Sequence, residues 1–433
     1  MLSRSRRRRV IALFVGAAVM VVGCKSAYQP SAQPTGLVPA AGPLAAPTSS
    51  EQVGLPVAAT QAAIPADNPQ TADKVALGEK LFFDGRLSVD GTVACSSCHD
   101  PARAFTDGRP ASVGIKGRLG ERNAPTVLNA LYNKTHFWDG RATTLEDQAA
   151  LPIQNPSEMG QPSLDAAVAG IAEDRAYQQA FQKIFDRPPN GPDLARAIAS
   201  YERTLVSFAA PFDAFIAGNQ NAISEPAKRG WELFTTKARC NKCHALSDTT
   251  RDPTFFTDHR FHNIGVGIAR HNVVALACKA QAQLNSGDRI AVDQAAIQSD
   301  LSVLGSFLVT KQQADIASFK TPGLRNVLIT APYFHDGSEA TLWDVVDHYN
   351  KGDGTDPWLD KDIQPLALSE TEIGYIVAFL ASLTSAQYRE QGVRELARQT
   401  AIARTSRPER DTARAFGPKP AQPDPALACV PAQ

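Results

Sequence analysis

Four stretches of the chain carry apolar residues at steps of three and four, the spacing that gathers them on one face of a helix. These stretches are residues 76–82, 164–185, 194–208 and 370–383. Ser369 precedes the last stretch as a plausible N-cap, with Glu370 and Glu372 in the first helical turn. Gly- and Pro-containing segments such as 100–110 and 331–338 predict loops. Because no series of alternating apolar and polar residues is present, the pattern predicts an all-α protein.

Residues 1–24 have the pattern of a secretory lipoprotein signal. An arginine-rich head precedes the apolar run Val10–Val22, which is shorter than the roughly 20 apolar residues that span a bilayer. The run leads into Cys24 as a sequence that resembles a bacterial lipobox, so we expect a lipid on Cys24 that anchors the chain to a membrane in the periplasm. Lys25 and Ser26 follow without an aspartate, which favours the outer membrane. The alternative is ordinary cleavage that removes Cys24.

Composition divides the rest of the chain into three parts. Residues 25–70 are rich in Pro, Ala, Ser and Gln and predict a disordered tether. Residues 71–385 have a globular composition and are long enough for two domains. Residues 386–433 are polar and arginine-rich, which favours a solvated helix followed by a loose tail. Lys and Arg together number 44, as do Asp and Glu, so the charge gives no indication of nucleic-acid binding.

Two Cys-x-x-Cys-His motifs carry the strongest chemical signal. They are Cys95-Ser96-Ser97-Cys98-His99 and Cys240-Asn241-Lys242-Cys243-His244. Two thiols at this spacing can add to the two vinyl groups of one porphyrin, which places the adjacent histidine under the iron as its ligand. Zinc knuckles or redox dithiols are the alternatives, but no second cysteine pair accompanies either motif to complete a zinc site. We therefore expect two cytochrome c-like helical domains with long loops, 71–217 and 218–385, each wrapping one covalent haem c.

Two further cysteines remain after Cys24 and the four haem thiols. They are Cys278 and Cys429. An even remainder in an oxidising compartment suggests one disulfide, which would pin the C-terminal tail to an insertion in the second domain. Two unpaired thiols are the alternative, because the sequence alone does not place the two cysteines within bonding reach.

Five longer blocks of sequence contain or follow the motifs. They are EKLFFDGRLSVDGTVACSSCHDPARAFTDG, RNAPTVLN, HFWDGRATTLEDQAALPIQNPSEMG, FKTPGLRNV and APYFHDGSEATLWDVVDHY. Over roughly residues 72–385 these blocks resemble the bacterial di-haem cytochrome c peroxidase and MauG superfamily. The resemblance implies that the first haem reacts with peroxide and that the second haem relays electrons to it, with a tryptophan between the two.

The resemblance also implies roles for the block that begins at HFWDG. Trp138 stands at the position of the family's bridging tryptophan, a role that is compatible with plain core packing. Gln148, Pro152 and Glu158 follow ten, fourteen and twenty residues later, as in the family's peroxide pocket. Cleavage of the O–O bond needs a proton moved from one peroxide oxygen to the other, which a buried carboxylate such as Glu158 can do. Gln148 can hold peroxide or water by hydrogen bonds. Without this context Glu158 would be an ordinary surface acid.

A calcium site between the domains is a further implication of the resemblance. Asn123 would supply its amide oxygen, and Thr330 and Pro332 their backbone carbonyl oxygens, with water completing the shell. Hard oxygen donors of this kind suit Ca²⁺. The alternative is a polar loop contact without a metal.

One departure from the peroxidase pattern concerns the first haem. Many family members carry a histidine about sixteen residues after the first haem motif, which blocks peroxide until the enzyme is reduced. Ile115 stands there in this chain, and residues 100–135 contain no histidine. We therefore expect the first haem to be open in the oxidised resting enzyme. His136 is the nearby candidate to replace the missing ligand, although a packing or hydrogen-bonding role at the domain junction is favoured.

A second departure concerns the relay haem, whose sixth ligand in the peroxidases is a methionine. Fourteen residues after His335 the sequence has Tyr349 instead. The resemblance to MauG, which has a tyrosine at this place, implies a phenolate ligand that stabilises ferric iron. The neighbouring His348 is the alternative ligand. MauG also has a tryptophan two residues before its second haem motif, where this chain has Ala238, so cross-linking of a tryptophan cofactor in a partner is not supported.

The sequence therefore predicts a peroxide-dependent di-haem oxidoreductase. H2O2 is expected to bind at the His99 haem, and a small cytochrome c or a cupredoxin is the expected electron donor. A MauG-like oxidase of a protein side chain is one alternative. A pure electron-transfer cytochrome is another, and the presence of Gln148 and Glu158 argues against it.

Overall fold

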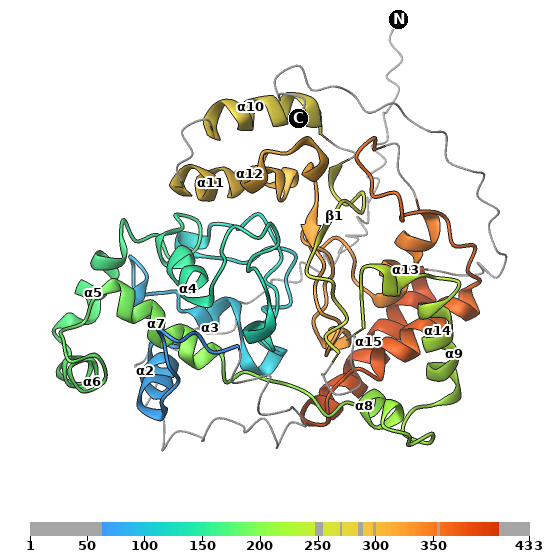
Figure 1. The fold of residues 1–433 in the computed structure, drawn as a ribbon, viewed down its shortest axis with the longest axis horizontal. Helices are drawn as coiled ribbons and strands as arrows, with labels where there is room; N and C mark the ends of the chain where they lie inside the picture. Colours follow the sequence, from blue (N-terminus) through green and yellow to red (C-terminus); the bar gives the residue numbers. More distant parts are fainter. Residues whose placement is uncertain are drawn as a thin grey trace, which may run out of the picture. The chain divides into compact units, whose positions relative to one another are not determined.

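The computed structural model describes residues 63–246, 254–268, 271–284, 289–297, 300–352 and 356–406. These residues form helices joined by long loops, with two two-residue strands, β1 (Phe261–His262) and β2 (Phe319–Lys320), paired antiparallel. The helices before residue 220 are α2 Ala72–Phe82, α3 Cys95–Cys98, α4 Leu145–Gln154, α5 Leu164–Ala172, α6 Arg175–Phe185, α7 Gly191–Glu202 and α8 Pro211–Ile216. Those after it are α9 Glu225–Thr235, α10 Val273–Leu284, α11 Arg289–Ala296, α12 Phe307–Thr310, α13 Leu342–Lys351, α14 Glu370–Ala381 and α15 Arg389–Ser406. The helix-rich fold agrees with the predicted class (Figure 1).

Three of the four predicted helices are present with shifted ends. The stretch 76–82 lies in α2, the stretch 194–208 overlaps α7, and the stretch 370–383 corresponds to α14. Ser369 caps α14 as predicted, because its side chain accepts from the amide of Glu372 while the Glu372 side chain accepts from the amide of Ser369. Helix α7 ends at Glu202, earlier than the apolar spacing indicated.

The predicted single helix over 164–185 is wrong, because the structure divides it into α5 and α6. Asp174 separates them in an extended conformation, and its side chain accepts a hydrogen bond from the amide of Ala176. An aspartate in this role satisfies one of the free amides at the start of a new helix. The apolar spacing continues across the break, so spacing alone did not reveal the cap.

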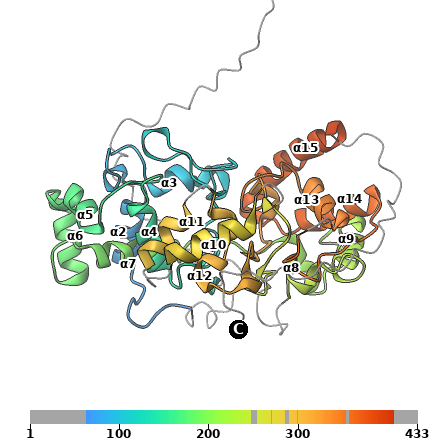
Figure 2. The same cartoon turned by 90° about the horizontal axis from the view of Figure 1, so that it is seen from above.

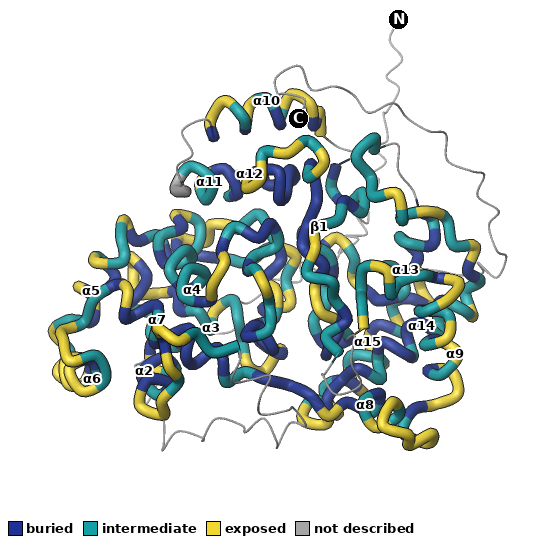
Figure 3. Tube along the Cα trace, viewed as in Figure 1, coloured by how far each residue is buried: buried dark blue, intermediate teal, exposed yellow. Residues whose placement is uncertain are grey.

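One main hydrophobic core runs through the helices on both sides of residue 217. It includes Leu81, Phe82 and Ile198 from the earlier part and Phe234 and Phe379 from the later part. In Figure 3 helix α7 is almost entirely buried, whereas α6 exposes most of its residues. Because the core is continuous, the division into two domains at residue 217 stays a prediction.

A second, smaller core belongs to an insertion formed by α10, α11 and α12. Its buried side chains, between Ile268 and Ala317, include Leu304 and Phe307. The three helices lie beside one another in both views (Figures 1 and 2). The insertion therefore has apolar packing of its own in addition to its contacts with the main body.

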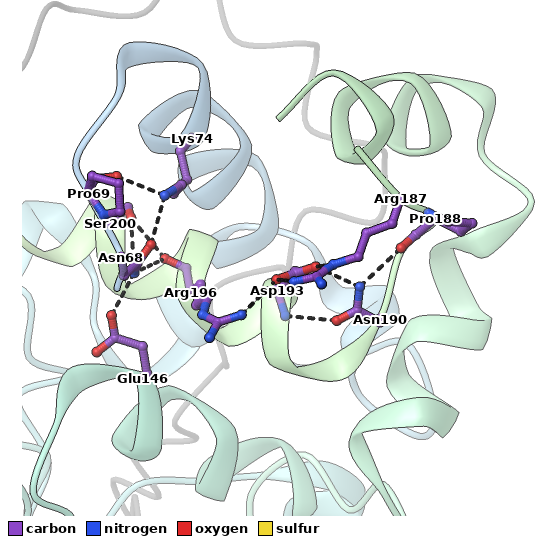
Figure 4. Close-up of polar contacts among 10 residues, drawn as sticks. All are labelled: Asn68, Pro69, Lys74, Glu146, Arg187, Pro188, Asn190, Asp193, Arg196 and Ser200. Carbon is purple, nitrogen blue, oxygen red and sulfur yellow. Dashed lines mark hydrogen bonds and ion pairs between the residues drawn. The ribbon is translucent and has the colours of Figure 1, made fainter. Parts of the chain in front are cut away.

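A polar network fixes α2 and α4 against α7 (Figure 4). The amide nitrogen of Asn68 donates to Glu146 Oε1 at 2.6 Å and to the carbonyl oxygen of Arg196 at 3.0 Å. Lys74 Nζ in turn donates to Asn68 Oδ1 at 2.8 Å. Because Glu146 lies in the first turn of α4, this network holds the helix that carries Gln148.

Both predicted polar ends contain folded residues next to the globular part. Asn68, placed in the tether by composition, is only 1% exposed because of the network around it. Gln399 of α15, placed in the polar tail, is fully buried and accepts from the amide of Leu342 at 2.8 Å. Its amide nitrogen donates to the carbonyl oxygen of Leu328 and to the hydroxyl of Tyr333. A single buried glutamine thus attaches a largely polar helix, which composition does not reveal.

Several predictions concern residues outside the described part of the chain. The signal sequence, the lipid site Cys24, most of the tether and Cys429 lie there. Cys278 lies inside and is disulfide-bonded, but its pairing with Cys429 stays a prediction. Among the described residues, no helix is both long and apolar enough to cross a membrane.

Candidate functional site: two cysteine–histidine motifs and a shared cavity

The local structure of the first motif orients His99 as a metal-binding residue. Cys95 and Cys98 begin and end the one-turn helix α3, and His99 follows directly. His99 Nδ1 donates to the carbonyl oxygen of Phe105 at 3.0 Å, since a carbonyl oxygen can only accept. This bond fixes the tautomer and leaves Nε2 as the atom available to a metal.

The second motif repeats this arrangement. Cys240 begins a short 3₁₀ turn, and His244 Nδ1 donates to the carbonyl oxygen of Phe256 at 2.8 Å. Phe105 and Phe256 both adopt left-handed backbone conformations, with φ of 59° and 57°. The same sequence motif is therefore held by the same local geometry twice.

A cavity of about 310 Å³ lies against the first motif. Cys95, Cys98 and His99 line it together with apolar side chains, among them Val127 and Leu145. Two thiols and a histidine with a free Nε2 beside an apolar space are the chemistry that a covalently attached haem requires. The first motif and its cavity therefore fit haem c.

The predicted peroxide-pocket residues line this same cavity. Gln148 and Pro152 come from α4, and Glu158 comes from the loop that follows it. Asn155 Nδ2 donates to Glu158 Oε1 at 2.7 Å. Burial raises the pKa of Glu158 to about 7, against the lowering effect of the nearby Arg141. Glu158 can therefore hold or release a proton near neutral pH.

Trp138 connects the two parts of the chain at the edge of the cavity. Its indole Nε1 donates to the carbonyl oxygen of Asn123 at 2.9 Å, and the amide of Asn123 donates to the carbonyl oxygen of His335 at 2.8 Å. The carbonyl oxygen of Trp138 accepts from the amide of Lys320 in β2 at 2.7 Å. A continuous chain of bonds therefore runs from the indole to His335 in the second part of the sequence.

Ile115 is the residue that the sequence analysis placed where the family resemblance implies a blocking histidine. It is 3% exposed, and its amide donates to the carbonyl oxygen of Glu158 at 2.9 Å. His136 lines the cavity, and burial lowers its pKa to about 4, so its ring is neutral at pH 7. Ile115 supplies no metal-binding atom, and His136 is the candidate that the sequence offers in its place.

Helices α4 and α13 are equivalent in local structure. Each follows a loop with a phenylalanine in the left-handed region, Phe137 at φ 63° and Phe334 at φ 68°. Each begins after a threonine, Thr144 or Thr341, whose hydroxyl accepts from an amide three residues ahead. Positions at the same distance from these caps can therefore be compared directly.

The neighbouring residues Tyr349 and His348 on α13 have different surroundings. Burial is the largest cause that raises the pKa of the Tyr349 phenol, and Tyr349 is within electrostatic range of Cys240 and Cys243. His348 Nε2 lies 2.8 Å from the carbonyl oxygen of Ile264 and donates to it. Tyr349 stays the predicted ligand of the second haem, and His348 stays the alternative.

The three predicted calcium ligands also line the first cavity. Asn123 uses its amide nitrogen to donate to the carbonyl oxygen of Arg109 at 2.8 Å, which leaves its amide oxygen for another partner. Within the described part of the chain, no hydrogen bond reaches this oxygen or the carbonyl oxygens of Thr330 and Pro332. Three oxygen donors of this kind fit a hard cation such as Ca²⁺.

The sequence analysis missed the charged residues around the cavity. Arg122 and Arg141 flank Asp139, whose carboxylate is fully buried, at 2.6 and 3.0 Å. Burial opposes ionisation, but the two arginines lower the pKa of Asp139 to about 2. Glu202 also lines the cavity, and burial raises its pKa to about 8. Asp139 and Arg141 belong to one of the blocks that resemble the family, but nothing else in the sequence indicated that they form this network.

The chain is similar to a known protein family and to several of its members. The family model described as di-haem cytochrome c peroxidase matches residues 72–221. Methylamine utilization protein MauG of Methylorubrum extorquens is 38% identical over 321 residues, which cover 74% of this chain and 80% of that protein. Cytochrome-c peroxidase IdrP1 of Denitromonas iodatirespirans is 38% identical over 330 residues, covering 74% of this chain and 84% of that protein. The crystal structure of a MauG-like protein associated with microbial copper homeostasis has a TM-score of 0.60 and 30% identity, covering 75% of this chain and 92% of that one.

Proposed function

The chain belongs to the family of di-haem cytochrome c peroxidases and MauG proteins, and on that premise we propose that it reduces H2O2 at the first haem with electrons relayed through the second. The family implies two c-type haems, which the two Cys-x-x-Cys-His motifs would hold. One observation carries the proposal: His99, Gln148 and Glu158 line a single cavity. A pure electron-transfer cytochrome has no need of such a pocket.

The side chains around the cavity suit proton transfer to peroxide. Haem c, when bound, supplies the iron at which peroxide accepts electrons. Glu158 as a carboxylate takes the proton from one peroxide oxygen and returns it to the oxygen that leaves as water. Gln148 orients the peroxide by hydrogen bonds. The raised pKa of Glu158, about 7, suits a group that must both accept and donate.

Electrons would reach the first haem by way of Trp138. Its indole is bonded to Asn123, which in turn is bonded to His335. The second haem would be held by Cys240, Cys243 and His244, with Tyr349 as a further candidate ligand of its iron. A small cytochrome c or a cupredoxin is the proposed donor, since relatives named cytochrome-c peroxidases imply a redox protein in this role.

A MauG-like oxidase of a protein side chain is the second candidate. The presence of Tyr349 fourteen residues after His335 favours it, because a phenolate bound to the iron would stabilise the ferric state and make that haem hard to reduce. Steady-state assays separate the candidates. A peroxidase oxidises many equivalents of reduced cytochrome or cupredoxin when H2O2 is supplied. A MauG-like oxidase, supplied with the same donor and H2O2, oxidises little of the donor.

Three accompanying proposals concern metal, membrane and compartment. Asn123, Thr330 and Pro332 bind one Ca²⁺, which a chelator should remove with a loss of thermal stability and without loss of haem. The lipid on Cys24 holds the protein on a membrane, the outer membrane in preference. The periplasm is the proposed compartment, because a secretory signal and c-type haem agree with it.

A further inference from the structure

The insertion α10–α12 reaches the cavity of the first motif. Ala296 and Ile297, at the end of α11, line the cavity together with Arg141 and Glu158. Arg122 donates from Nη2 to the carbonyl oxygen of Ser302, in the same insertion, at 2.8 Å. A segment from the second part of the sequence therefore forms part of the wall around the peroxide site.

Arg141 links this segment to the cavity wall through an ion pair. Its Nε lies 2.9 Å from Asp293 Oδ1 in α11, and its Nη1 lies 3.0 Å from Asp139 Oδ2. Its guanidinium carbon is 3.6 Å from the centre of the Phe137 ring. The side chains of Arg141 and Asp293 are only 8% and 14% exposed. Solvent screening is weak at such positions, so the charge of Asp293 acts strongly on its neighbours.

Arg122 and Arg141 pair with the carboxylates of Asp139 and Asp293. Arg141 and Asp293 are the charged groups that act on Glu158, whose own hydrogen-bond partner, Asn155, is neutral. Removal of the Asp293 charge would leave an excess positive charge beside Glu158. That charge would stabilise the carboxylate of Glu158 over its protonated form.

We propose that Asp293 is a positioning residue of the peroxide site, which holds the guanidinium of Arg141 at the cavity wall that Arg141 shares with Glu158. This inference rests on the proposed function of Glu158 as the group that moves the peroxide proton. A residue from a separate helical insertion thus sets the pH range in which the cavity works. The insertion is part of the active site and not only a structural addition.

The test compares Asp293→Asn with wild type over a range of pH. Two quantities are followed: the rate of reaction with H2O2 and the affinity for fluoride, an anion that a neighbouring carboxylate repels. In both, the apparent pKa of Glu158 is expected to fall by about one unit, the scale of a nearby charge. Asp293→Glu, which keeps the charge, should restore the wild-type profile. Asp293→Ser is a second neutral variant in case the asparagine variant is poorly folded.

Asp300→Asn is the matched control, because Asp300 lies in the same insertion, is 41% exposed and pairs with Lys279. It should lower thermal stability slightly and leave both pH profiles in place. Suppose that the neutral variants at Asp293 retain both haems and shift neither pH profile more than the control does. If Glu158→Gln still abolishes the pH dependence, the proposed role of Asp293 is refuted while that of Glu158 is kept. If Glu158→Gln keeps the wild-type pH dependence, the proposed function of Glu158 fails as well. A shift of both profiles in the neutral variants, absent from Asp293→Glu, supports the proposal.

Discussion

Pro152 and Tyr349 occupy the same position on two equivalent helices, since each is the eighth residue after the threonine that caps its helix. Pro152 lines the cavity of the first motif, and Tyr349 lies beside the cysteines of the second. A proline side chain has no atom that binds iron, whereas a phenol oxygen does. The two halves therefore place different chemistry at one structural position, a side chain without a metal-binding atom in the first and a phenol oxygen in the second.

Tyr349→Phe tests this difference directly. The variant removes the phenol oxygen and keeps the ring, so the second haem should lose its low-spin signal or take up water while the first haem is unchanged. Electron paramagnetic resonance (EPR) of the oxidised protein measures this. Tyr349→Met should raise the reduction potential, because a neutral thioether replaces an anionic phenolate.

His348→Ala is the control for this prediction. Its ring donates to the carbonyl oxygen of Ile264, so its loss should affect stability and not the low-spin signal. If the alanine variant abolishes that signal and the phenylalanine variant preserves it, the neighbouring histidine is the ligand.

The resting ferric enzyme should react with H2O2 without prior reduction. Ile115 is buried beside Glu158 and offers no nitrogen to the first iron. A five-coordinate high-spin signal is therefore expected, and Ile115→His should decrease it. His136→Ala tests the histidine that the sequence offers as a replacement for the missing ligand. Two low-spin haems that ignore peroxide until one is reduced would contradict this prediction.

The two motifs and the helical class could be predicted because their information is local, as in the single turn from Cys95 to His99. Gln148 and Glu158 were assigned through the family resemblance, and the structure places both at one cavity. The pairing of Arg141 with Asp293 could not be predicted, since 152 residues separate them and no spacing links them. Similarly, the apolar spacing across Asp174 hid a helix cap that depends on one backbone conformation.

Gln399 should contribute strongly to stability although it lies in a polar segment. Gln399→Ala leaves the buried amide of Leu342 without its partner and removes one of the two donors to the carbonyl oxygen of Leu328. A buried group left unsatisfied costs about 1–3 kcal/mol. We expect a loss of roughly 2 kcal/mol or more in the free energy of unfolding, measured by denaturant titration of the haem-loaded protein. Arg394→Ala on the same helix, at a largely exposed position, should have little effect.

Lipidation of Cys24 predicts that the mature protein fractionates with membranes. Cys24→Ser should release it into the soluble periplasmic fraction, because a serine hydroxyl cannot form the thioether to diacylglycerol. Immunoblots of both fractions measure this. Wild-type protein that is soluble and begins well after residue 24 would show ordinary cleavage instead.

Glu158 should control the pH dependence of peroxide reduction. Only its carboxylate form can accept the peroxide proton, and burial raises its pKa to about 7. As the pH falls through this value, Glu158 is already protonated when peroxide binds and cannot accept its proton. The rate constant for reaction with H2O2 should therefore decrease toward acid pH with a midpoint near 7. Glu158→Gln removes the proton acceptor and keeps the shape, so turnover should fall about a hundredfold or more and the acid limb should disappear. Both haems should stay attached, since Glu158 is not part of either motif, and an optical spectrum verifies this. Stopped-flow rates from pH 5 to 9 that show the same limb and the same magnitude in both proteins would return Glu158 to a structural role.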